Sequence, residues 1–175
     1  MWGKSTNQVS VIETDARIPM KHALSQFVVR LKVSPEYHND GNLTSAKLKA
    51  TASKFATTGT MNLNDGGKIT FQPTSTELTW SPNTTVPAQG QQAVDYAAAI
   101  YPMALAAGEV SLEVVIDGAT YTYAIPQITW EAGKRYIYSI TMRSNDAEIG
   151  GENGQSVTIE GWTSTEEDIT LVPVK

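Results

Sequence analysis

The 175-residue sequence predicts an all-β fold, a two-sheet β-sandwich of roughly seven to eleven strands. Two observations support this class. Short runs of β-branched and aromatic residues alternate with polar residues, which is the period of a strand with one face in a core. Segments rich in Gly, Pro, Asn and Asp separate these runs at short intervals, and no segment shows a convincing helical period. A closed barrel is the main alternative.

The most informative segment is residues 109–142. Asp117-Gly118 separates two strand-like runs, and this dipeptide favours a type I′ hairpin because both central positions of that turn need positive φ. After a polar turn at residues 131–134, residues 135–142 again alternate between polar and large apolar side chains. We therefore expect three consecutive strands here, forming the middle of a sheet.

The remaining strands are predicted with more ambiguity. Residues 25–33 should be half buried, with Phe27 and Val29 on the core face and Val28 and Arg30 on the other. Residues 94–103 contain helix-favouring alanines, but the run is short and contains Pro102, so a strand is favoured. The other predicted strands are residues 43–51, 60–63, 68–71, 78–80, 157–159 and 169–172, with weaker edge candidates at 9–12 and 16–20, and a loop is expected over 144–155.

The domain organisation follows from this pattern. No internal repeat or strong boundary interrupts it, so residues 15–175 are expected to form one sandwich domain. Residues 1–14 are expected to be a linker or an edge strand. The first residues contain no apolar stretch of the kind found in secretion signals, so the protein is either cytoplasmic or has lost a leader.

Composition excludes several function classes. The net charge is −5 and lysine and arginine are not clustered, which argues against nucleic-acid partners. There is no cysteine, so disulfides, thiol nucleophiles and cysteine-ligated metals are excluded. No run of about 18 apolar residues is present, so we expect no membrane insertion by this segment.

The sequence predicts no catalytic, cofactor-binding or metal-binding residues. Nucleophile-elbow and phosphate-loop motifs are absent. His22 and His38 lack the spacing of zinc ligands, and turn chemistry explains the Asn-Asp-Gly segments at 39–42 and 64–67. Glu131, beside a tryptophan, is the nearest candidate for a catalytic carboxylate, and a solvated turn residue is the better interpretation.

The tryptophans could form a carbohydrate platform or part of the core. Trp80, Trp130 and Trp162 lie within or beside apolar strands, so core packing is favoured.

Three segments resemble a known family, in the same order along the chain. Residues 20–29 (MKHALSQFVV) resemble the "F-x-H-A-L-S-K-V-x-F" strand of the fimbrillin-like proteins of Bacteroidales. Residues 130–141 (WEAGKRYIYSIT) resemble their "W-x-A-G-K-x-Y-x-Y-x-I-T" strand, and residues 159–162 (IEGW) their closing "I-x-x-W". The resemblance implies a transthyretin-like β-sandwich in a non-enzymatic structural or adhesive subunit of a cell-surface fimbria.

The resemblance also implies partners, location and mechanism. Such proteins are exported as lipoproteins to the outer membrane, trimmed by a protease and joined to other fimbrial subunits by strand addition. The lipid-bearing cysteine is not in this chain, so we expect the C-terminal part of a longer precursor, with no cofactor. The alternative function is a surface module that binds a glycan or a host protein. The candidate strand-exchange residues are Ile169, Leu171, Val172 and Val174, in a terminal alternating segment isolated by a polar loop.

Overall fold

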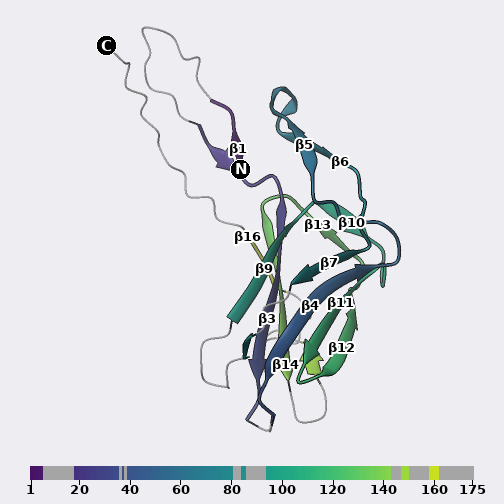
Figure 1. The fold of residues 1–175 in the computed structure, drawn as a ribbon. Helices are drawn as coiled ribbons and strands as arrows, with labels where there is room; N and C mark the ends of the chain where they lie inside the picture. The colour runs from purple at the N-terminus through teal and green to yellow at the C-terminus, as the bar shows by residue number, and fades with distance from the viewer. Residues whose placement is uncertain are drawn as a thin grey trace.

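The computed structural model describes residues 1–5, 18–35, 37, 39–80, 84–85, 94–142, 147–149 and 158–161. Two five-stranded sheets face each other across one apolar core (Figure 1), which confirms the predicted all-β, two-sheet class. Within the described residues, the one helical segment is a 3-10 turn at Leu63–Asp65. The transthyretin-like strand order implied by the resemblance stays a prediction.

The first sheet is called the β4–β11 sheet after its central strands. Its order is β12-β11-β4-β7, with β8 also paired to β4, and the pairs are antiparallel. The strands are β4 (Asn42–Ala50), β7 (Glu77–Trp80), β8 (Thr84–Thr85), β11 (Val110–Ile116) and β12 (Ala119–Ala124).

The second sheet is called the β3–β14 sheet. Its order is β15-β14-β3-β9, and its central pair, β3 and β14, is parallel. β16 and β15 pair successive parts of the same edge of β14, opposite Lys134 to Ile137 and Ile140 to Met142. The strands are β3 (Ser25–Val33), β9 (Val94–Ile100), β14 (Lys134–Met142), β15 (Ala147–Ile149) and β16 (Thr158–Gly161).

Three two-stranded ribbons complete the fold. They are β1 (Trp2–Gly3) with β2 (Met20–Lys21), β5 (Gly59–Asn62) with β6 (Lys68–Phe71), and β10 (Met103–Leu105) with β13 (Ile128–Trp130). Figure 1 shows the β5–β6 hairpin projecting beyond one end of the sandwich, with β1 at the same end.

The core contains the inner faces of both sheets. Its centre is aromatic: the Phe27 and Tyr138 rings stack with centroids 4.7 Å apart, and Trp130 meets Phe27 edge-on at 5.7 Å. Burial raises the pKa of Tyr138 to about 12, so this core hydroxyl stays neutral. The fully buried large side chains are Phe27, Leu31, Leu43, Leu48, Leu112, Ile116, Ile125, Trp130, Tyr136, Ile137, Tyr138 and Met142.

The Asp117-Gly118 hairpin forms as predicted. Both residues have positive φ, 49° and 79°, as the turn requires. The Asp117 carboxylate accepts hydrogen bonds from the backbone amides of Gly41 and Asn42, at 2.9 and 2.8 Å, and from the Tyr37 hydroxyl. This turn therefore fastens the loop that leads into β4.

Two expectations about strand placement are wrong. Residues 109–142 do not form the middle of one sheet, because β11 and β12 belong to the β4–β11 sheet and β14 to the other. The chain changes sheets through β13, which pairs with β10 instead of extending the β11–β12 ladder. The loop expected over residues 144–155 contains β15, which pairs with the end of β14.

The expected half burial of residues 25–33 is also wrong at one position. Val28 points to the outer face, yet it is fully buried, as is Ile137 beside it on β14. The central parallel pair is therefore covered on both faces. The strand candidates at residues 9–12 and 169–172 lie outside the described residues.

Candidate functional site

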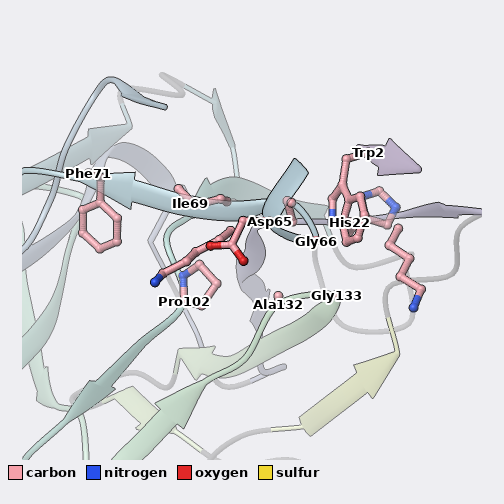
Figure 2. A pocket seen from close by; sticks show the side chains of 13 residues that line it. Trp2, His22, Asp65, Gly66, Ile69, Phe71, Pro102, Ala132 and Gly133 are labelled. Atoms are coloured by element: carbon pink, nitrogen blue, oxygen red, sulfur yellow. The ribbon is translucent and has the colours of Figure 1, made fainter. Parts of the chain in front are cut away.

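A cleft of about 580 Å³ lies at the end of the sandwich that carries the ribbons. The β1–β2 ribbon, the β5–β6 hairpin and the turn before β14 enclose it. Figure 2 shows Trp2 and His22 at one end of the cleft, Phe71 at the other, and Asp65 between them. A second cavity of about 220 Å³ shares His22 and Ile69 with it.

The β5–β6 hairpin and the β1 strand contact each other closely beside the cleft. Gly67 has a φ of 76°, and a Cβ at this position would overlap the Trp2 indole, so only glycine fits beneath that ring. At the other end of β6, Phe71 stacks on Tyr101 with ring centroids 4.1 Å apart. The β5–β6 hairpin thus contacts an aromatic ring at its turn and another at its base.

The chemistry of the cleft suits binding better than catalysis. Trp2, Ile69 and Phe71 give it apolar walls, and Lys21 and Lys68 add positive charge. Of the described residues that line it, Asp65 alone carries a carboxylate, whereas glycoside hydrolysis uses two. The described part of the chain contains no group of three or more residues suited to hold a metal ion.

A cluster of one carboxylate and two guanidinium groups lies on the outer face of the β3–β14 sheet. Asp95 on β9 accepts two hydrogen bonds from Arg30, at 2.6 and 2.8 Å, and one from Arg135 on β14 at 2.7 Å. The Arg30 hydrogen bond is the main reason that the pKa of Asp95 lies below its usual value. Guanidinium groups donate to both oxygens of this carboxylate, which indicates a structural role.

The two long sides of the sandwich differ in how they are closed. On one side the edge strands are β7 and β9, and the Trp80 indole on β7 donates to the Ala97 carbonyl on β9 at 3.4 Å. On the other side, a gap of about 90 Å³ remains between β12 and β14. Its walls include Leu112, Tyr123 and Met142.

The structure places some of the residues considered in the sequence, and others lie outside the described residues. His22 lines the cleft, while His38 lies outside the described residues. Glu131 is exposed, and its backbone carbonyl accepts a hydrogen bond from Ser25 at 2.8 Å. The strand-exchange candidates lie outside the described residues: Ile169, Leu171, Val172 and Val174.

The tryptophan prediction is confirmed where it can be checked. Trp130 is fully buried, and Trp80 is half buried against Phe27, with ring centroids 6.0 Å apart. Trp162 lies outside the described residues. Sequence reasoning missed Trp2 and the cleft, because no local pattern links the first residues to the β5–β6 hairpin.

No helix in the described part of the chain is long and apolar enough to span a bilayer.

Comparisons with solved structures find the same fold in Bacteroides proteins. A candidate cell adhesion protein of Bacteroides ovatus aligns with a TM-score of 0.57 and 20% identity over 82% of this chain and 46% of that one. One from Bacteroides uniformis has a TM-score of 0.59 and 15% identity over 93% and 66%. A fimbrial protein of Bacteroides vulgatus has a TM-score of 0.56 and 18% identity over 83% and 56%. This chain therefore spans less than two thirds of each.

The family assignment rests on a separate comparison. No curated protein matches the chain. The model of the family described as fimbrillin-like matches residues 1–162, which is most of the sequence. This extent of match, together with the shared all-β fold, shows that the chain belongs to the fimbrillin-like family.

Proposed function

We propose that the chain is a non-enzymatic structural or adhesive subunit of a bacterial cell-surface fimbria. The observation that carries this proposal is the family match over residues 1–162. The fold supports it, because a sandwich with open sheet edges offers backbone groups for joining one subunit to the next. The partners are then other fimbrial subunits, and the location is the fimbria at the outer membrane of the cell.

Assembly by β-strand addition is the proposed mechanism. An extended segment of one subunit adds to a sheet edge of another; backbone hydrogen bonds give affinity, and pockets for alternate side chains set the register. The proposed donor is residues 169–174, where Ile169 and Leu171 alternate with Thr170 and Val172. No charged residue interrupts this run.

The test is assembly of the chain with and without a functional donor. Replacing the four candidate residues by serine should abolish polymers seen by electron microscopy and sedimentation; they are Ile169, Leu171, Val172 and Val174. The matched control replaces Glu166 and Glu167 by glutamine, which changes the neighbouring acidic residues and leaves the apolar residues intact. Polymers of unchanged length from the serine variant would refute this donor.

A glycan- or host-protein-binding module is the second candidate function. The cleft favours it, because an aromatic wall beside lysines suits a sugar or an acidic peptide. A glycan array comparing wild type with Trp2→Ala should then show binding that the substitution removes. Trp80→Ala is the control, since it deletes a tryptophan outside the cleft. An array without any wild-type signal rules out the glycan form of this function.

A further inference from the structure

We propose that the cleft binds a glycan through a sugar that carries a carboxylate, with a neutral sugar beside it in the second cavity. This inference rests on the glycan-binding form of the proposed function and specifies its class of ligand. Three features of the described residues support it: the charge of the cleft, the fixed positions of its aromatic side chains, and the difference in charge between the two cavities.

The cleft is a positive site on a negative chain. Lys21, Lys68 and Asp65 line it, so these charged side chains have a net charge of +1, whereas the whole chain has a net charge of −5. On β4, Lys47 and Lys49 both form ion pairs with a glutamate. Within the described residues, by contrast, no ion pair involves Lys21 or Lys68. Their ammonium groups can therefore donate to an anionic group of a ligand.

Asp65 favours a sugar carboxylate over a ligand with many charges. Figure 2 shows Asp65 between the end of the cleft that holds Trp2 and the end that holds Phe71. A carboxylate accepts hydrogen bonds from hydroxyl groups, and a sugar supplies several of them. The same carboxylate repels closely spaced negative charges, such as those of an acidic peptide or a sulfated polysaccharide. A sugar with one carboxylate and several hydroxyl groups therefore fits this set of charges.

The aromatic side chains of the cleft are held in place by the protein. Trp2 packs on Gly67, where an added Cβ would lie 2.3 Å from the indole. Phe71 stacks on Tyr101 at the base of the hairpin. One face of a pyranose ring exposes C–H groups that can pack on an aromatic ring. Because these rings are already fixed, little side-chain entropy is lost when such a ligand binds.

Small residues leave room between the aromatic ends. Gly66 and Gly133 line the cleft, and a Cβ added at Gly66 would meet no atom within 4 Å. Ala132, which also lines the cleft, is exposed. The volume of about 580 Å³ lies within the range of about 300–1,000 Å³ that is usual for ligand pockets.

The second cavity extends the site and lacks its charged side chains. It shares His22, Ala23 and Ile69 with the cleft, so the two cavities adjoin. Among the described residues, no lysine, arginine or carboxylate side chain lines it, whereas Thr60 and Tyr101 supply hydroxyl groups. Its volume is about 220 Å³. We therefore place a neutral sugar here, next to the acidic sugar in the cleft.

A glycan array tests the class of ligand. It presents uronate- and sialate-bearing oligosaccharides, each beside its carboxyl-reduced form, together with heparin and poly-glutamate. The wild-type chain should bind the carboxylate glycans about tenfold or more tightly than the reduced forms, because reduction removes a charge-assisted hydrogen bond. Equal binding of the reduced forms overturns the acidic sugar. Tighter binding of heparin or poly-glutamate overturns it in favour of a polyanion.

Substitution of a lysine tests the source of the charge. Lys68→Met keeps an apolar stem and removes the ammonium group, so it should weaken binding of the carboxylate glycans about tenfold and leave binding of the reduced forms unchanged. Lys32→Met on β3 is the matched control, because Lys32 lines neither cavity. Equal effects of the two substitutions overturn the assignment of Lys68.

Filling the cleft tests the location. Ala132→Trp should abolish binding, because the new side chain occupies the space between the aromatic ends. Ala107→Trp is the matched control, since Ala107 is exposed in a turn and lines neither cavity. Circular dichroism checks that both variants are folded. Unchanged binding by a folded Ala132→Trp variant overturns the cleft as the site.

Asp65→Asn tests the exclusion of polyanions. The amide keeps an acceptor oxygen and removes the negative charge, so binding of heparin should rise several-fold relative to binding of the carboxylate glycans. An unchanged ratio overturns the role of Asp65 in selecting the ligand.

The array also separates the two levels of inference. Absence of wild-type binding to every glycan overturns glycan binding as a function, and this ligand with it. Binding of neutral glycans that Trp2→Ala removes, without any preference for a carboxylate, overturns the class of ligand alone and leaves glycan binding standing.

Discussion

The outer faces of the two sheets are built differently. In the β3–β14 sheet, Val28 and Ile137 are buried on the outer face, so the central parallel pair is covered on both sides. In the β4–β11 sheet, Val115 and Glu113 occupy the outer face of a central strand and are partly exposed, the Glu113 side chain to 13%. Parallel strands are usually buried on both faces, and antiparallel ones often have one face in water. We therefore expect substitutions on the outer face to destabilise the fold more in the sheet whose central pair is parallel.

The charged clusters on these faces differ in the same way. Asp95 on β9 bonds to Arg135 on β14, so the Arg135 side chain crosses the intervening β3 near Val28. Glu113 binds Lys47 and Lys49, at 3.0 and 2.6 Å, on the adjacent strand only. We infer that the Arg135 stem covers apolar groups, whereas Lys47 and Lys49 hold Glu113, whose side chain is 13% exposed, through point charges on flexible stems.

The largest difference is expected for aliphatic truncation. Ile137→Ala should lower the free energy of unfolding by about 3 kcal/mol, because it leaves a cavity in a covered face. Val115→Ala, at the half-exposed position, should cost about 1 kcal/mol or less. Urea denaturation of the two variants measures both values. Equal costs would contradict the idea that only one outer face is covered.

A smaller difference is expected for the carboxylates. Asp95→Asn should cost about 1–2 kcal/mol, because the amide keeps one acceptor oxygen but removes the negative charge from three hydrogen bonds with arginine. Glu113→Gln should cost less, about 0.5 kcal/mol, because its two lysine partners are flexible, strongly hydrated point charges that can turn toward water. The same urea titration applies, and a larger effect of Glu113→Gln would reverse the assignment of the two clusters.

The loss of stability in acid should also differ between Asp95 and Glu113. The pKa of Asp95 is lowered chiefly by the Arg30 hydrogen bond, so its contribution is present above its unfolded pKa near 3.8 and is lost as pH falls through the folded value. Asp95→Asn should therefore flatten the loss of stability between about pH 4 and pH 2. Glu113, whose pKa is lowered chiefly by Lys49, should give a weaker flattening when changed to glutamine. Parallel acid curves for wild type and Asp95→Asn would contradict the role of this cluster.

The smallest expected effect is that of salt. At about 1 M NaCl the Debye length falls to about 3 Å, which screens the ion pairs of both clusters. The cost of both substitutions should then fall, and Asp95→Asn should keep the larger share of its cost, because the two parallel hydrogen bonds from Arg30 depend on geometry as well as on charge. Thermal melts of both variants and the wild type at low and high salt measure the cost of each substitution.

Local signals explain the parts of the fold that could be predicted. The Asp117-Gly118 hairpin and the hairpin around residues 64–67 depend on turn residues that are adjacent in sequence. A strand over residues 94–103 was favoured over a helix because the run is short and contains Pro102, and it forms as β9, which ends at Ile100.

The parts of the fold that could not be predicted depend on which strands pair with each other. Nothing in residues 134–142 indicates whether they pair with the preceding hairpin or with β3, since alternation defines faces and leaves neighbours open. One signal was available: Phe27-Val28-Val29 and Tyr136-Ile137-Tyr138 are uninterrupted apolar triplets, as expected of strands covered on both faces. The cleft could not be predicted, because Trp2 and Phe71 come to line the same cleft only through the docking of two ribbons.

The parallel pairing of β3 with β14 also constrains the order of folding. The partners of this central pair are separated by more than half of the chain, so the pair cannot form during synthesis until residue 142 has been made. Such non-local contacts raise the contact order, which slows folding and prolongs the lifetime of unpaired strands. The two hairpins, by contrast, can close as soon as their turns are synthesised.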